Sequence, residues 1–202
     1  MSLERIEALH RRLRDAIDGG GLPEVTPWRG SATLGRELIE SMLRSRHLDR
    51  AALELRTRGH GHYTTASAGH ESNVVLGRLT TRADPSLVHY RSAALQLERA
   101  RQVPEIDGVR DVTLSLVAAK EEPASGGRHK VLGHPALGIL PSTSTIASHL
   151  PRAVGLAFGL ERRRRLLGFG APDAIAMASF GDASLNHSTL LGALNAASWV
   201  LQ

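Results

Sequence analysis

The stretch AIAMASFGDASLNHSTLLGALNAA, residues 174–197, decides the fold class predicted for this chain. Its first seven residues are a short apolar run, which is typical of a strand buried in a parallel sheet. Gly181 and Asp182 follow directly, and the spacing of Leu190 and Leu194 then indicates a helix. A buried strand that runs through a Gly-Asp turn into a helix indicates an α/β domain.

The Gly-Asp turn offers a specific chemistry. In an open parallel sheet, ligands bind beyond the carboxyl ends of the strands. Glycine lets the backbone approach a ligand closely, and the carboxylate of Asp182 is a hard oxygen ligand of the kind that joins Mg²⁺ to phosphate groups. The sequence therefore predicts a metal-diphosphate site here. The alternative is that Asp182 is only the N-cap of the following helix.

The rest of the chain alternates between helical and strand patterns. A second strand is expected over 87–90, ending at Arg91. Apolar spacing predicts helices over 3–17, 73–79, 92–101 and 143–160. Two further helices are expected to begin near residues 32 and 188. Residues 56–69 and 120–138 are predicted loops, and the second is expected to bury little apolar surface and to be mobile without a cofactor. The predicted fold is α/β, with a parallel sheet flanked by helices.

Two units are expected. Residues 1–30 form a helical arm and a linker, because the first helix ends at three glycines and two prolines follow. Residues 31–202 form one domain, since a chain of this length buries one good core.

Composition narrows the class of protein. A hydrophobic share of 42% and a charged share of 22% are ordinary for a globular protein. The chain has no cysteine, which excludes a disulfide scaffold or a thiolate metal site and fits the reducing cytoplasm, where we expect the protein. No stretch approaches the roughly 18 apolar residues of a membrane span, so no membrane contact is expected.

Basic and histidine-rich segments raise two alternatives. The net charge of +5 and the run Arg162–Arg165 allow a nucleic-acid-binding protein, although cations at a solvated helix end explain the run better.

Three histidines, His60, His62 and His70, are enough in number for a zinc site, but their spacing matches no common zinc pattern. They could instead face a ligand, or be hydrogen-bonded loop residues.

Five blocks of the chain stand out, in this order: RGHGHYTTASAGHES, VHYRSAALQLERA, GGRHKVLGHP, PSTSTIASHLPRAVGLAFGLE and SFGDASLNHSTLLGALNAA. Together they resemble the alpha-type domain of thiamine-diphosphate-dependent 2-oxoacid dehydrogenases, the decarboxylating components of 2-oxoacid dehydrogenase complexes. The last block is similar to the thiamine diphosphate motif of that family, and the five blocks follow the family order. The ordered set covers about 34–202, and it implies the thiamine-diphosphate-binding fold, incomplete at its C-terminus.

The resemblance also implies which residues bind the cofactor. The positions that match the cofactor-binding residues of the family are Tyr90, Arg91, Ser144, Ile146, Gly181, Asp182 and Ala183. Among these, Tyr90 and Arg91 would reach the diphosphate, and Asp182 would bind the Mg²⁺. The family's monovalent-cation site, with K⁺ as the candidate ion, corresponds to Thr143, Thr145 and Ser148. No catalytic residue is identified.

Three departures from the family pattern stand out. Ala183 replaces the second glycine of the Gly-Asp-Gly motif, and Asn186 with His187 replaces a Ser-Glu pair. His149 stands where a glutamine is common, which puts the cation site in doubt.

The implied reaction is the oxidative decarboxylation of a 2-oxoacid, of pyruvate or branched-chain type, with acyl transfer to lipoamide. The implied partners are a pyrimidine-binding (beta-type) domain in the same or another chain, the lipoyl acyltransferase core, and further copies of the chain. This chain alone is expected to be inactive. Alternatives are another thiamine-diphosphate enzyme, such as acetoin dehydrogenase or transketolase, and a non-catalytic assembly domain.

Overall fold

The structure is a computed structural model that describes residues 3–21, 27–61, 66–128, 131–143, 145–171 and 173–200. The elements are, in chain order, α1 (Leu3–Asp18), α2 (Ala32–Thr57), η1 (Glu71–Asn73), α3 (Val74–Leu79), β1 (Ser86–Leu87), α4 (Ala93–Ala100), α5 (Gly108–Leu116), η2 (Pro135–Leu137), α6 (Leu150–Leu167), β2 (Met177–Ala178), η3 (Asp182–Asn186) and α7 (Ser188–Val200), where η marks a 3₁₀ helix. Among the described residues, no helix combines the length and apolar character needed to cross a membrane.

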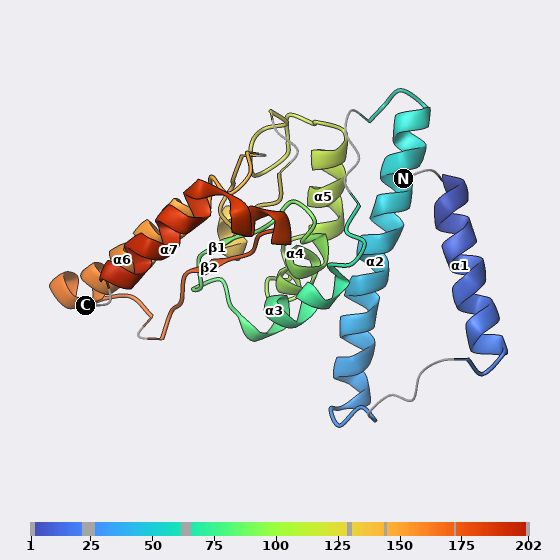
Figure 1. Cartoon of the computed structure of the whole chain (residues 1–202), viewed down its shortest axis with the longest axis horizontal. Coiled ribbons are helices and arrows are strands. Elements are labelled where there is room, and N and C mark those ends of the chain that lie inside the picture. The colour runs from blue at the N-terminus through green and yellow to red at the C-terminus, as the bar shows by residue number, and fades with distance from the viewer. Residues whose placement is uncertain are drawn as a thin grey trace.

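Two short parallel strands lie between two groups of helices. Figure 1 shows α6 and α7 on one side of the strands and α2 to α5 on the other. β1 pairs with β2 in parallel, with Ser86 opposite Met177 and Leu87 opposite Ala178. On its other side, Ser86 forms a parallel bridge to Ile139. The predicted parallel pairing is therefore confirmed within a largely helical structure.

Both strands are shorter than the sequence predicts. Strands were expected over 87–90 and 174–180, but the ladder covers two residues of each segment. The reason lies just beyond β1, where the backbone N–H of His89 donates to the hydroxyl of Ser179 at 2.8 Å rather than to a backbone carbonyl. A side-chain acceptor that takes a backbone donor ends the ladder.

The core is built around α4, which is buried along its whole length. Its apolar residues pack with α2, α5 and the segment after β1 in one cluster: Leu48, Val88, Ala93, Leu95, Leu97, Ala100, Val112, Leu132, Leu137 and Ile139. A second, smaller cluster joins α6 to α7 through Ala147, Leu150, Leu190 and Ala193. The two clusters flank the strands and fix where their carboxyl ends lie.

A buried arginine ties α4 to the strand region. Arg99 is fully buried, and its guanidinium donates to Ser86 Oγ at 2.9 Å and to the Leu137 carbonyl at 3.3 Å. It also reaches the Asp84 carbonyl at 3.2 Å and the hydroxyl of Thr80. Burial lowers the pKa of Arg99. One side chain thus satisfies several polar groups that the core would otherwise leave unpaired.

Three helix predictions need correction or addition. α6 begins at Leu150, so the start predicted near Thr143 is wrong: hydroxyl groups between 143 and 148 hydrogen-bond within their own turn and hold it out of the helix. The end predicted at residue 160 is also wrong, because α6 continues to Leu167 and stops at its C-cap Gly168, where φ is 66°. α5 has no counterpart among the helices expected from apolar spacing, although Asp107 caps it by accepting from the backbone N–H groups of Val109 and Arg110.

The segment 120–138 buries more apolar surface than the sequence predicts. Its described part is irregular except for η2, as predicted, but Val131, Leu132 and Leu137 are buried, so the expectation that it buries little apolar surface is wrong. The carboxylate of Glu122, itself buried, accepts from the backbone N–H groups of Ala124 and Ser125. These bonds fold 120–128 into a tight turn.

Charged side chains of α1 and α6 have partners close to them. α1 lies beside α2 in Figure 1, where Glu7 approaches Arg50 to 4.0 Å. In α6, Arg164 pairs with Glu161 at 2.7 Å, and Arg163 lies over the Phe169 ring at 4.6 Å. Arg164 and Arg165 lie in the last turn of α6, and both pair with Glu161, so the interpretation of the arginine run as a solvated helix end is confirmed.

Candidate functional site

The carboxyl ends of β1 and β2 come together. Beyond the paired residues, the backbone N–H of Ser179 donates to the Leu87 carbonyl at 3.0 Å, and the Ser179 hydroxyl accepts from His89 at 2.8 Å. Parallel strands end at the same edge, so Arg91 and Gly181 follow at neighbouring positions. This edge is where ligands bind in α/β sheets.

A cleft of about 230 Å³ opens at this edge. Its lining comes from segments that lie far apart in the sequence: His70, Val88–Arg91, Val131 and Leu132, Ser142 and Thr143, Thr145–Ala147, His149, and Gly181–Ser184. Every one of the five resembling blocks contributes at least one of these residues.

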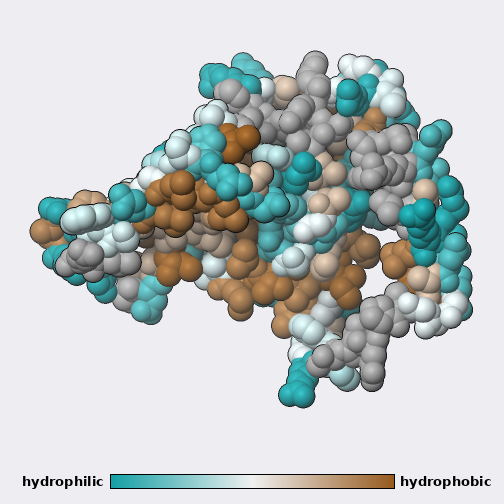
Figure 2. Space-filling view, in the orientation of Figure 1, coloured by the Kyte–Doolittle hydropathy of each residue, from teal (hydrophilic) through white to brown (hydrophobic). Residues whose placement is uncertain are grey.

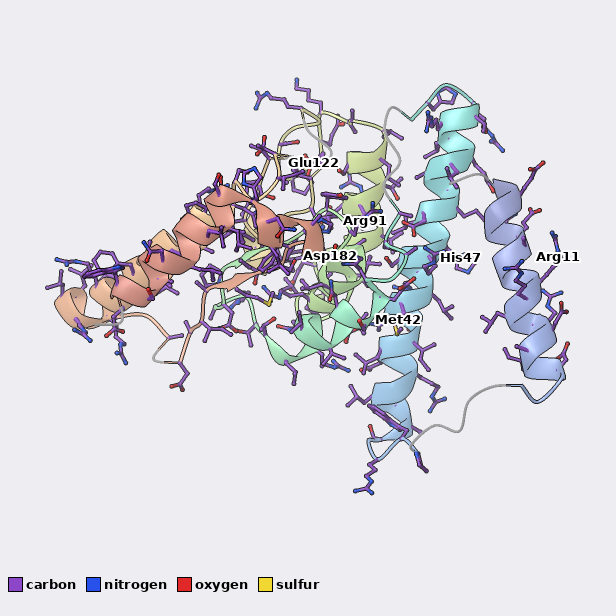
Figure 3. All side chains as sticks on the ribbon, viewed as in Figure 1. Arg11, Met42, His47, Arg91, Glu122 and Asp182 are labelled. Atoms are coloured by element: carbon purple, nitrogen blue, oxygen red, sulfur yellow. The ribbon has the colours of Figure 1, made fainter. Side chains whose placement is uncertain are left out.

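Most of the predicted cofactor-binding residues line this cleft. Those are Tyr90, Arg91, Ile146, Gly181, Asp182 and Ala183. Ser144 lies outside the described residues. In Figure 3, Arg91 and Asp182 both lie near the centre of the molecule, and both line the cleft. Their convergence agrees with the expectation from the sequence, while their roles in binding stay predictions.

Arg91 is held in place by the loop before η1. One of its guanidinium nitrogens donates to the Ala66 carbonyl at 2.6 Å, and the group lies over the Tyr90 ring at 5.1 Å. Next to Ala66, the backbone N–H of Ser67 donates to the carboxylate of Asp49 in α2 at 2.9 Å. The cation is therefore half-buried and oriented, and its remaining donors can bind an anion.

Asp182 is the first residue of η3 and is exposed. Gly181 holds the N-cap position of η3 and Asp182 lies one residue after it, which argues against the N-cap alternative. Within the described part of the chain, no ion pair or side-chain hydrogen bond of Asp182 is found. The carboxylate is thus open to the cleft and to a cation.

Ala183 fits its position without strain. Among the described non-glycine residues, a positive φ is found at Ala118 and Ala147 only. Ala183 therefore has an ordinary backbone conformation, and the departure from Gly-Asp-Gly removes no freedom that this turn uses.

The predicted cation-site residues are close together but bond to one another. The hydroxyls of Thr143 and Ser148 are 3.0 Å apart, and Ser148 Oγ donates to the Thr145 carbonyl at 2.9 Å. Nearby, the buried His149 bonds through Nε2 to the Ser179 carbonyl at 2.9 Å. Since a carbonyl only accepts, that nitrogen carries a proton. In place of the common glutamine, His149 thus anchors this turn to the end of β2.

His89 is the site residue that the sequence reasoning missed. Its ring stacks on His70 with centroids 5.2 Å apart and meets the Tyr90 ring at 3.9 Å. Burial, together with the charges of His70, Arg91 and His149, lowers the pKa of His89 to about 4. The feature of the sequence that could have identified His89 is its position directly before Tyr90 and Arg91 at a predicted strand end.

Two of the three histidines considered for a zinc site lie among the described residues. His70 lines the cleft, as the ligand-facing alternative allows, while His60 is exposed and His62 lies outside the described residues. In the part of the chain that the structure describes, no group of three or more His, Cys, Asp or Glu side chains could hold a metal ion.

The chain matches no protein-family model and no curated protein.

Proposed function

We propose that this chain is the diphosphate-binding part of a thiamine-diphosphate-dependent 2-oxoacid dehydrogenase. The full enzyme would decarboxylate a 2-oxoacid oxidatively and pass the acyl group to lipoamide. One observation carries the proposal: residues from all five resembling blocks line a single cleft at the carboxyl end of the parallel strands. If the likeness of the five blocks to the family were accidental, their residues would not be expected to line the same cleft.

The residues of the cleft fit the cofactor's diphosphate end. Arg91 would bind the diphosphate through guanidinium donors other than the one bonded to Ala66, and the exposed carboxylate of Asp182 would bind Mg²⁺. Ile146, which is 59% exposed, would offer an apolar contact to the rest of the cofactor. When bound, thiamine diphosphate supplies the electron sink for decarboxylation. The hydroxyl cluster of Thr143, Thr145 and Ser148 is the proposed K⁺ position.

The size of the cleft supports the need for a second domain. Its volume of about 230 Å³ is below the roughly 300–1,000 Å³ of sites that enclose a whole small molecule. We therefore propose that a pyrimidine-binding domain, in the same or another chain, completes the site. Figure 2 shows apolar surface over α6 and α7, where Phe158, Leu191 and Leu194 are exposed, and such surfaces often contact partners.

The remaining parts of the proposal rest on the resemblance. They are a lipoyl acyltransferase core as partner, assembly with further copies of the chain, and a cytoplasmic enzyme. Acetoin dehydrogenase and transketolase are alternatives, because the same cleft residues would serve any enzyme that binds thiamine diphosphate.

The test is an NMR titration of this chain, which resolves weak binding. We expect thiamine diphosphate with Mg²⁺ to shift signals of the cleft and thiamine with Mg²⁺ to leave them unchanged, because the diphosphate provides the contacts. Arg91→Gln and Asp182→Asn should each weaken binding by about tenfold or more. Asp173→Asn, the same change at an exposed position, is the matched control. Equal shifts with thiamine, or unchanged binding by both cleft variants, would overturn the proposal.

A further inference from the structure

The ring of His89 is fixed in one tautomer. Its Nδ1 accepts the backbone N–H of Arg91 at 3.4 Å, so this nitrogen carries no proton. In a neutral imidazole one nitrogen donates and the other accepts, and the proton must therefore sit on Nε2.

The protonated nitrogen faces the strand end. A Cβ added to Gly181 would lie 3.4 Å from Nε2 of His89, which is the side-chain atom nearest to that position. His89 and Gly181 both line the cleft, beside Asp182. Nε2 therefore points to the place where a ligand would approach the Gly-Asp turn.

The surroundings keep the ring oriented and uncharged. The stacked His70 and the adjacent Tyr90 ring hold it on two sides. The cationic or titratable groups that act on it are His70 from the segment before η1, Arg91 from its own segment and His149 from the turn before α6. With its burial, they lower the pKa of His89 to about 4, so the ring is neutral at neutral pH.

We propose that His89 is a further ligand-binding residue of this cleft, which donates Nε2–H to a phosphate oxygen while its Nδ1 stays bonded to the Arg91 amide. The inference deepens the proposed function and rests on it, because it assumes a phosphate-bearing ligand. Arg91 would supply the charge and His89 a directional, uncharged donor. Removing a donor to a charged group weakens binding by about tenfold or more.

Two variants separate the ring's nitrogens. In His89→Gln the amide nitrogen reaches as far as Nε2, so the donor is retained. In His89→Asn the shorter amide can accept from Arg91 as Nδ1 does, but it leaves no donor at the Nε2 position. His47→Gln, on the exposed side of α2, is the matched control.

The experiment measures binding of inorganic pyrophosphate to the whole chain in metal-free buffer. We expect dissociation constants within about threefold of wild type for His89→Gln and His47→Gln, and about tenfold weaker binding for His89→Asn. Thermal melting of His89→Asn close to that of the control would show that the loss is not one of folding. The ¹⁵N signals of His89 should keep the neutral Nε2–H pattern between pH 6 and 8, with and without pyrophosphate.

Each other outcome is decisive. Wild-type affinity in His89→Asn, or protonation of the ring on binding, would overturn the inference and leave the proposed function standing. If pyrophosphate does not bind the wild-type chain, the inference fails, and the titration with thiamine diphosphate and Mg²⁺ decides the proposed function separately.

Discussion

The hydroxyl group of Ser179 accepts a hydrogen bond of 2.8 Å from the backbone N–H of His89 and so joins the ends of the two parallel strands. The carbonyl of the same residue accepts from His149 at 2.9 Å, and its backbone N–H donates to Leu87 at 3.0 Å. One serine thus connects three of the segments that line or adjoin the cleft.

Ser179→Ala should therefore destabilise the fold. It leaves the backbone N–H of His89 without its acceptor, and we expect the free energy of unfolding to fall by about 1–2 kcal/mol, measured by urea denaturation. Ser198→Ala in α7 removes an exposed hydroxyl that donates to the Asn195 carbonyl of the same helix, and it should change stability by less than about 0.5 kcal/mol. Equal effects of the two changes would contradict the central role of Ser179.

Arg99→Met tests the buried arginine. Methionine fills much of the same volume but leaves the Leu137 carbonyl and Ser86 hydroxyl without their donor. We expect a loss of about 2–4 kcal/mol, because each unsatisfied buried group costs about 1–3 kcal/mol and removal of a desolvated cation offsets part of this. Arg162→Met, at an exposed position of α6, is the control and should lie within about 0.5 kcal/mol of wild type. An unchanged free energy of unfolding in Arg99→Met would show that the desolvation of the buried guanidinium costs as much stability as its hydrogen bonds contribute.

Glu122→Ala should loosen the turn at 120–128. The backbone N–H groups of Ala124 and Ser125 lose their shared acceptor, so their hydrogen exchange should become faster, with a loss of stability of about 1–3 kcal/mol. Glu121→Ala, at the exposed neighbouring position, should leave these exchange rates unchanged. Fast exchange of the two amides already in the wild-type chain would instead support the mobile loop predicted from composition.

Stability should depend on pH through His89. Its pKa is about 4 in the folded chain and near 6.5 when unfolded, so the unfolded chain binds more protons between these values. The free energy of unfolding should therefore fall as the pH is lowered from about 6.5 towards 4. Burial raises the pKa of Asp111, which acts in the opposite direction, so the comparison is made between variants. His89→Gln should flatten the slope, whereas His47→Gln should not; an NMR titration midpoint of His89 near 6.5 would refute this.

The sequence by itself determined most of the local elements and their order. The apolar run before Gly181 and the helical spacing on either side follow from periodicity and turn chemistry, which act between near neighbours. The order of the five blocks likewise anticipated that Tyr90, Arg91 and Asp182 would share one site.

Only the tertiary structure decided how that site is built. The early end of the strands, the buried position of Arg99 and the neutral, fixed ring of His89 depend on partners such as Ser179, which lies 90 residues from His89. No local pattern encodes these contacts, because burial and charge change a side chain's bonding and pKa only after packing has brought distant segments together.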